Sequence, residues 1–193
     1  MKKIEQAGRI CYKSEDKITP GSAAGFVRRL IKSGHHSVLE HVSISVKFVC
    51  DRGISHELVR HRLASYSQES TRFCNYKGGL TFIIPPWIDL EAGEYKVLFS
   101  KAASTGGRVW VWYKSIFEAE RNYLILLADG MPPEQARSIL PNSLKTELIM
   151  TCNLREWRHV FALRCSKKAH PQMRELMLPL RSEMRRIIPV IFD

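Results

Sequence analysis

A short polar stretch from Arg60 to Arg72 constrains this chain more than any other part of its sequence. It gathers three arginines, a histidine and several hydroxyl side chains, with few apolar residues between them. Such a stretch does not suit a core element, because burying an unpaired guanidinium is strongly unfavourable. Arginine presents a planar fork of donors that matches the oxygens of phosphate and carboxylate groups. We therefore interpret the stretch as an anion-binding site with a polar wall, and we expect the anion to be a nucleotide.

The spacing within this stretch resembles the signature of the flavin-dependent thymidylate synthases. In that signature an Arg-His-Arg triplet, here residues 60–62, is followed after seven residues by a serine, here Ser70. Three neighbouring segments resemble one branch of the same family: His56–Val59, Ser65–Gln68 and Arg72-Phe73. The resemblance covers nearly the whole chain, from Cys11 to about Pro179. The alternative interpretation of the stretch is the solvated basic end of a helix.

Length and composition fit one ordinary globular domain, with 193 residues, 45% of them apolar and 25% charged. The chain has no run of eighteen apolar residues, so we expect no membrane-spanning segment and no membrane partner. Residues Met1–Gln6 lack the apolar stretch of a signal peptide. The five cysteines are scattered and never form a Cys-x-x-Cys pair. This usage favours reduced thiols in the cytoplasm over a disulfide framework or a zinc ribbon.

The net charge of +11 invites a second interpretation, a basic module that binds RNA or DNA without catalysis. The basic residues are spread along the chain in pairs such as Arg28-Arg29, and they form no basic arm. Small anionic ligands explain the charge equally well, so we expect no nucleic-acid partner. The nucleic-acid interpretation predicts a colourless protein with strongly salt-dependent binding to polynucleotides.

Hydrophobic patterning and the resemblance together predict an α+β fold, a single domain with a small, largely antiparallel sheet packed by helices. We assign residues 1–193 to one domain, in which the family's N-terminal strand is missing. Helices are expected over residues 1–12, 22–33, 54–62, 89–103, 108–129, 132–140 and 171–188, with another beginning at Asn153. Strands are expected over residues 42–50, 72–76, 80–84 and 144–152.

The segment His35–His41 permits three interpretations. The imidazoles of His35, His36 and His41 and the carboxylate of Glu40 are possible metal ligands, although we expect no metal. Ser37 and Glu40 also have the spacing of a capping box at the start of a short helix. The resemblance implies instead that the hydroxyl of Ser37 and the carboxylate of Glu40 face the flavin.

Three other catalytic patterns are disfavoured by the sequence. His56-Glu57 and His61 do not form a zinc-protease motif, because the histidines would stand about 140° apart on a helix of ~100° per residue. No cysteine lies in the polar stretch, and most cysteines are small buried apolar residues. No histidine–carboxylate pair is arranged to activate Ser70 as a nucleophile, so we assign it a binding role.

A second functional segment is expected between Asn153 and Arg164. Asn153 is the expected N-cap of a helix, with Glu156 reaching back to it. Arg155 stands in the first turn, where the helix dipole disfavours a cation, and this local cost suggests a function. Arg164 stands about 180° from Arg155 on a helix of ~100° per residue, so we expect Arg155 and His159 on one side and Arg164 on the other.

The resemblance implies an enzyme that methylates dUMP to dTMP, with methylenetetrahydrofolate as carbon donor and NADPH-reduced FAD as hydride source. The FAD-binding residues that it implies are Ser37, Glu40, Arg60, His61, Arg62, Gln68, Asn153, Leu154, Arg155 and His159. The dUMP-binding residues that it implies are Glu57, Leu58, Val59, Arg60, Gln68, Glu69, Ser70, Thr71, Arg72, Arg137 and Arg164. Arg164 is also the expected catalytic residue, because it can stabilise negative charge that develops on the uracil ring.

The resemblance further implies a cytoplasmic homotetramer whose active sites are shared between subunits. Many relatives have Asn-Glu where this chain has Ser67-Gln68, and here the acid is displaced to Glu69. A flavoprotein scaffold without synthase activity is the remaining alternative. Tritium release from C5-labelled dUMP separates that scaffold from the enzyme.

Overall fold

The structure is a computed structural model that describes residues 1–95 and 107–193. These residues divide into two compact units. Unit 1 comprises Met1–Val46, His61–Tyr66 and Met150–Asp193, and unit 2 comprises Lys47–Arg60 and Ser67–Ile149. The assignment of residues 1–193 to one domain stays a prediction.

Three strands form one antiparallel sheet in the order β1-β3-β2. The strands are β1 (Ser43–Asp51), β2 (Ala64–Gln68) and β3 (Lys145–Asn153). In β1 every second residue from Ile44 to Cys50 is less exposed than its neighbours, as the alternation in the sequence predicts. A small antiparallel sheet combined with many helices confirms the predicted α+β class.

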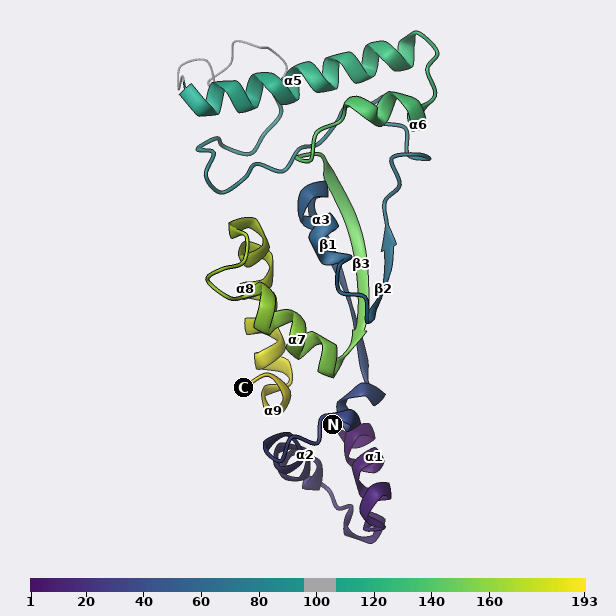
Figure 1. The fold of residues 1–193 in the computed structure, drawn as a ribbon, viewed down its shortest axis with the longest axis vertical. Coiled ribbons are helices and arrows are strands. Elements are labelled where there is room, and N and C mark those ends of the chain that lie inside the picture. Colours follow the sequence, from purple (N-terminus) through teal and green to yellow (C-terminus); the bar gives the residue numbers. More distant parts are fainter. Residues whose placement is uncertain (96–106) are drawn as a thin grey trace. The chain divides into compact units, whose positions relative to one another are not determined.

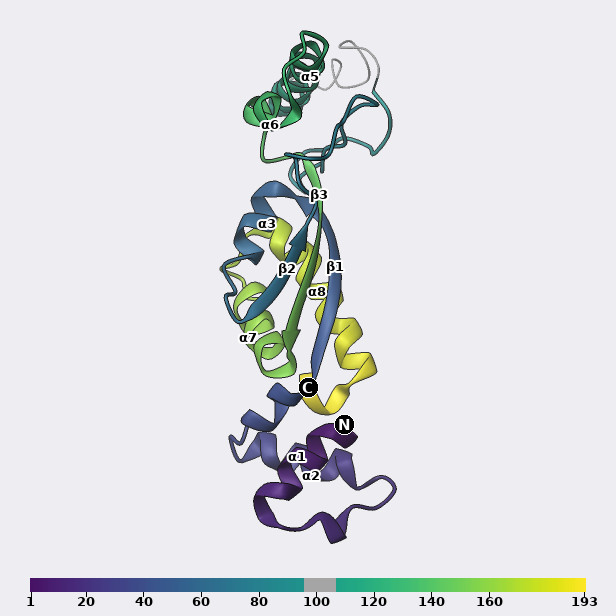
Figure 2. The same ribbon diagram turned by 90° about the vertical axis from the view of Figure 1, so that its right-hand side faces the viewer.

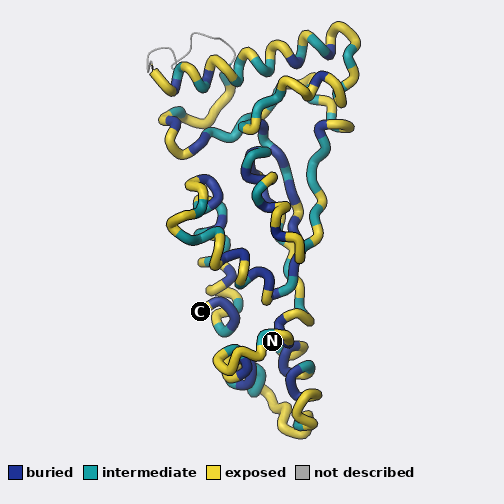
Figure 3. Tube along the Cα trace, viewed as in Figure 1, coloured by how far each residue is buried: buried dark blue, intermediate teal, exposed yellow. Residues whose placement is uncertain are grey.

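Unit 1 begins with two helices, α1 (Lys2–Tyr12) and α2 (Ser22–Lys32), which lie side by side (Figure 1, Figure 2). The exposed loop between them contains the short 3₁₀ helix η1 (Glu15–Lys17) (Figure 3). Gly8 allows the close contact, because a Cβ atom there would lie 2.7 Å from the Phe26 ring. Both helices confirm the predictions from apolar spacing.

The other helical elements of unit 1 are η2 (Ser37–His41), α7 (Leu154–Arg164), α8 (Pro171–Ile187) and α9 (Pro189–Phe192). Asn153 caps α7 as predicted, since its Oδ1 accepts a hydrogen bond of 2.9 Å from the Glu156 amide. The fully buried Trp157 ties α7 to β1, because its Nε1 donates to the carbonyl of Ile44 at 3.1 Å. The α7 backbone is thereby fixed close to its N-terminus.

Unit 2 contains α3 (Arg52–Leu58), α5 (Gly107–Ala128), α6 (Pro133–Ala136) and η3 (Arg137–Ile139). Asp51 caps α3 by accepting a hydrogen bond of 2.6 Å from the Ile54 amide. The long helix α5 runs beside α6 (Figure 1), and Tyr123, Leu127 and Ala136 form a buried cluster between them. None of the helices in residues 1–95 and 107–193 is long and apolar enough to cross a membrane.

Several predicted elements differ from the structure. Residues 72–76 and 80–84 are not strands, and only an isolated bridge between Phe82 and Leu144 remains of the predicted pairing. Strand β2 was not predicted from the sequence. Of the helix predicted over residues 89–103, residues 89–95 are irregular and the remainder lies outside the described residues.

Candidate functional site

The predicted anion-binding stretch follows α3, passes through a turn, forms β2 and ends in a second turn. His61 is buried, with 5% of its surface exposed, whereas its neighbours Arg60 and Arg62 are both exposed. The two guanidinium groups are therefore accessible to an anion, while the imidazole belongs to the interior. The exposed arginines can therefore bind a ligand directly, whereas the buried imidazole can only contact other side chains of the protein.

The His61 imidazole contacts two side chains of α7 within unit 1. Its Nε2 accepts a hydrogen bond of 3.0 Å from the Nε of Arg164, and its Nδ1 lies 3.5 Å from Oε1 of the buried Glu156. Burial, together with the charges of Arg164 and His159, lowers the pKa of His61 to about 4. The ring is therefore neutral near pH 7. Because Nε2 accepts a hydrogen bond, the single ring proton belongs on Nδ1, which faces Glu156.

One sequence prediction about α7 is wrong, and a second holds only in part. Glu156 does not reach back to the N-cap, since its carboxylate faces His61 instead. Arg155 and Arg164 have different partners, as expected, since Arg155 donates to Glu40 and Arg164 donates to His61. His159 was expected beside Arg155, but its ring meets the His61 ring edge-on at 6.1 Å between centroids.

The carboxylate and imidazoles of His61, Glu156 and His159 have ligand atoms within 4.8 Å of one another, which is compatible with a metal site. However, Nε2 of His61 already accepts a hydrogen bond from Arg164. A cation at this point would also lie beside the guanidinium charge, and like charges at such distances repel. We therefore assign no metal to this cluster.

The segment His35–His41 does not form the predicted capping box, and three of its side chains have partners within unit 1. Helix η2 lacks a side-chain cap, so the capping-box interpretation is wrong. His35 Nδ1 lies 3.1 Å from the Tyr12 hydroxyl and His36 Nε2 lies 3.3 Å from a backbone carbonyl. Glu40 accepts a hydrogen bond of 2.6 Å from Arg155 Nη1, and this exposed ion pair offsets the unfavourable position of Arg155 in the helix dipole.

In unit 2 the structure brings together Thr71, Arg72 and Arg137 from the predicted nucleotide site. Arg137 Nη1 donates to the Thr71 hydroxyl at 3.2 Å. Arg72 Nε donates to Oε2 of Glu134 at 2.9 Å, and Arg137 Nε donates to the Glu134 carbonyl at 3.1 Å. Glu134 was not predicted from the sequence, although its position three residues before Arg137 was a signal that the two could meet in one turn.

The side chains of Gln68 and Glu69 are held by residues of unit 2. Gln68 Nε2 donates to the hydroxyls of Ser55 at 2.8 Å and Thr146 at 3.2 Å. The Glu69 carboxylate accepts hydrogen bonds from Tyr76 at 2.7 Å and Lys145 at 3.3 Å. Any ligand that uses these atoms must compete with the existing hydrogen bonds.

The remaining predicted residues divide by burial. Leu58 and Leu154 are fully buried, so neither offers accessible surface to a ligand in this structure. Val59 is exposed and Glu57 is half-buried at the end of α3. The Ser70 hydroxyl accepts a hydrogen bond of 3.3 Å from the Arg72 amide. Ser70 therefore helps to shape the turn that carries Arg72.

Comparison with known proteins places these residues in a family. The family described as thymidylate synthase complementing protein matches residues 1–190. This chain belongs to that family. The resemblance found from the polar stretch is thereby confirmed.

Relatives of this family member are named flavin-dependent thymidylate synthase. The protein from Geobacter sulfurreducens is 33% identical over 98% of this chain and 79% of its own length. The proteins from a Mycobacterium species and from Mycobacterium tuberculosis are 35% and 34% identical, each over 98% of this chain and 77% of the relative. The similarity therefore includes both units.

The cysteines of this family member have the environment of structural residues. All five are free thiols, and Cys50 and Cys152 are buried. Burial is the main cause that raises the pKa of each of these two thiols to about 12. A thiol that stays protonated is a poor nucleophile, so these two cysteines do not support covalent catalysis.

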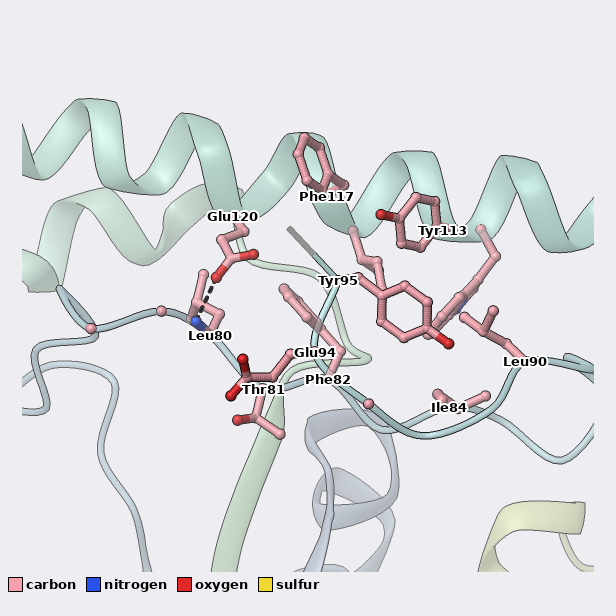
Figure 4. A pocket seen from close by; sticks show the side chains of 15 residues that line it. Leu80, Thr81, Phe82, Ile84, Leu90, Glu94, Tyr95, Tyr113, Phe117 and Glu120 are labelled. Atoms are coloured by element: carbon pink, nitrogen blue, oxygen red, sulfur yellow. Dashed lines mark hydrogen bonds between the residues drawn. The ribbon is translucent and has the colours of Figure 1, made fainter. Parts of the chain in front are cut away.

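Unit 2 also has a cavity of about 590 Å³ beneath α5 (Figure 4). Its walls include the rings of Tyr95, Tyr113 and Phe117, and Glu120 accepts a hydrogen bond of 2.7 Å from the Leu80 amide. The described residues that line it include no arginine and none of the predicted site residues. We therefore do not assign it to the nucleotide.

Proposed function

We propose that this protein is a flavin-dependent thymidylate synthase that converts dUMP to dTMP. Methylenetetrahydrofolate supplies the carbon and NADPH supplies the reducing equivalents. The observation that carries the proposal is membership of the family over residues 1–190, with an arginine-rich stretch at the position of its signature. The roles of individual residues below are part of the proposal.

The described residues fit a flavin dinucleotide, whose diphosphate needs cationic donors. Arg62 and Arg155 are exposed, and the ion pair of Arg155 with Glu40 is open to solvent, so an anion can compete for the guanidinium. When bound, FAD supplies the hydride chemistry, and the protein supplies binding and orientation. The residues that we propose to bind it are Ser37, Glu40, Arg60, Arg62, Gln68, Asn153, Leu154, Arg155 and His159, with His61 contributing through its backbone and not through its buried imidazole.

The dUMP phosphate is assigned to Arg72 and Arg137. Their contacts with Glu134 and Thr71 hold the two guanidinium groups in one region of unit 2. Arginine pairs with phosphate through two parallel hydrogen bonds, which fixes orientation as well as charge. The other residues that we propose to contact dUMP are Glu57, Leu58, Val59, Arg60, Gln68, Glu69, Ser70, Thr71 and Arg164.

Arg164 is the proposed catalytic residue. Its guanidinium would hydrogen-bond the uracil edge and stabilise the negative charge that develops on N3 and the adjacent oxygen while C5 becomes nucleophilic. Donors that are already positioned where charge develops lower the barrier more than donors that must reorganise. The hydrogen bond from Arg164 to His61 supports this proposal, because it restricts the arginine before substrate binds.

We also propose that the protein is a cytoplasmic homotetramer with active sites shared between subunits. The groups that form one site then need not all come from a single chain. Equilibrium sedimentation measures the assembly directly. A monomer at micromolar concentration would contradict the proposed tetramer without affecting the assigned reaction.

Two measurements on purified protein test the proposed function. The first is visible absorption, since the enzyme should be yellow with flavin bands, whereas a nucleic-acid-binding module would be colourless. The second is tritium release from C5-labelled dUMP in the presence of methylenetetrahydrofolate and NADPH. A yellow protein that releases no tritium would be a flavoprotein scaffold, and the proposed function would be wrong.

A further inference from the structure

The side chain of His61 has a different task from the arginines beside it. We propose that Glu156 and His61 are positioning residues, which hold the guanidinium of Arg164 in the orientation required at the uracil ring. This inference rests on the proposed role of Arg164 and goes beyond it, because it assigns the His61 side chain to an arginine and not to the flavin.

Glu156, His61 and Arg164 are connected in series inside unit 1. The Glu156 carboxylate lies 3.5 Å from Nδ1 of His61, and Nε2 of the same ring accepts a hydrogen bond of 3.0 Å from Arg164 Nε. Glu156 and His61 are both buried, at 7% and 5% exposure. The backbone at His61 is fixed as well, because the Tyr66 hydroxyl donates to its carbonyl at 2.8 Å.

The charged groups around His61 determine which of its ring nitrogens carries the proton and which accepts a hydrogen bond. His61 faces the Arg164 guanidinium, the His159 ring and the Glu156 carboxylate. A protonated His61 would offer no lone pair to Arg164 and would repel its charge. The carboxylate favours the tautomer with the proton on Nδ1, and that tautomer leaves Nε2 as the acceptor for Arg164. Glu156 therefore acts on Arg164 through the imidazole.

Holding the arginine in advance has a physical advantage. An arginine side chain loses rotamer freedom when it is fixed, and this loss is among the largest of any side chain. A hydrogen bond at Nε restricts the plane of the guanidinium, so less of this cost remains when the uracil arrives. Loss of the His61 acceptor should then affect the step that involves the uracil ring more than it affects the binding of the dUMP phosphate.

Two substitutions at His61 separate positioning from packing. In His61→Gln the amide oxygen extends to about the place of Nε2 and still accepts from Arg164. In His61→Asn the shorter amide reaches only to about Nδ1, so the contact with Glu156 is retained and the acceptor for Arg164 is lost. His170→Asn is the matched control, since His170 is exposed at the start of α8 and asparagine is a good N-cap.

The readouts are kcat for tritium release, FAD bound per chain, and the affinities for dUMP and for deoxyribose 5-phosphate. We expect His61→Asn to lower kcat at least tenfold and to lower the ratio of dUMP to deoxyribose 5-phosphate affinity. The FAD content and the deoxyribose 5-phosphate affinity should stay within twofold of the wild type. His61→Gln should recover most of kcat, and Glu156→Ala should change the same quantities as His61→Asn.

Two results would overturn the positioning role. One is wild-type kcat and wild-type base-dependent affinity in His61→Asn. The other is an equal loss in the Asn and Gln variants with a matching loss of FAD or of folded protein, since that result shows packing or flavin binding. Arg164→Ala separates this failure from failure of the proposed function. If Arg164→Ala is inactive while His61→Asn is active, only the positioning inference is wrong.

Discussion

The Nε of Arg72 and the Oε2 of Glu134 lie 2.9 Å apart and form an ion pair in unit 2. Both side chains are substantially exposed, so the pair contributes little to stability. The backbone carbonyl of Glu134 also accepts a hydrogen bond from Arg137. One acidic residue therefore contacts both arginines that we assign to phosphate, and a bound phosphate must compete with its carboxylate.

The substitution Glu134→Gln should lower the KM for dUMP. The amide keeps the shape of the side chain but removes a negative charge that repels phosphate and pairs with Arg72. We expect a decrease of about threefold, since exposed charge pairs are worth roughly 0.2–1 kcal/mol. Steady-state kinetics measures it, with Glu118→Gln on the exposed face of α5 as the control. A higher KM would show that Glu134 orients Arg72 for the ligand.

The substitution Arg72→Ala should raise the KM for dUMP by about tenfold or more, because a charge-assisted hydrogen bond contributes roughly 1.5–3 kcal/mol. The content of FAD should be unchanged, since Arg72 is assigned only to the phosphate. The exposed Arg121→Ala on α5 controls for loss of one positive charge. Equal KM values in the two variants would remove Arg72 from the phosphate site.

The α1–α2 pair of unit 1 provides a stability test. Glu5, which is 2% exposed, pairs with the buried Arg9 at 3.1 Å and accepts a hydrogen bond from Ser22. Glu5→Ala leaves the arginine buried without its carboxylate and should lower the free energy of unfolding by about 3 kcal/mol. Guanidinium denaturation measures the change, and Glu15→Ala at an exposed position is the control. A loss below about 1 kcal/mol would contradict the structural account of this pair.

His61 should make stability depend on pH. Its pKa is lowered from 6.5 to about 4 in the folded state, so the unfolded chain binds more protons between these values. The neutral ring stabilises the fold fully above pH 6.5, and this contribution decreases as the pH falls toward 4. Wild type should therefore lose about 2–3 kcal/mol more than His61→Gln between pH 7.5 and 4.5. Urea unfolding at the two pH values measures it, and an equal loss in both proteins would exclude a buried neutral His61.

Local patterns predicted α1, α2 and α8 and the strands β1 and β3, because apolar spacing and alternation are visible within one segment. They did not predict α9, and residues 89–95 of an expected helix are irregular. Strand β2 escaped prediction since its residues, Ala64–Gln68, are mostly polar and only half-buried. The strand predicted over residues 72–76 is absent, and Phe73 within it is 77% exposed. The presence of an apolar side chain in a short segment does not show whether the fold buries it.

The candidate site was predictable where a signature marks it and not where it depends on distant contacts. The sequence identified His61 and Arg164, but it could not show that residues 103 positions apart share a hydrogen bond. Glu156 was assigned to capping because local rules favour an acid in the first turn of a helix. Only the fold shows that its carboxylate faces an imidazole instead.

The most direct test of the account is the rate of tritium release from C5-labelled dUMP by Arg164→Ala, measured together with the FAD bound per chain. Loss of one positioned donor for developing charge typically costs about 10²–10³ in kcat. We predict a loss of at least about a hundredfold with normal FAD content. Tritium release at the wild-type rate would contradict the catalytic role of Arg164.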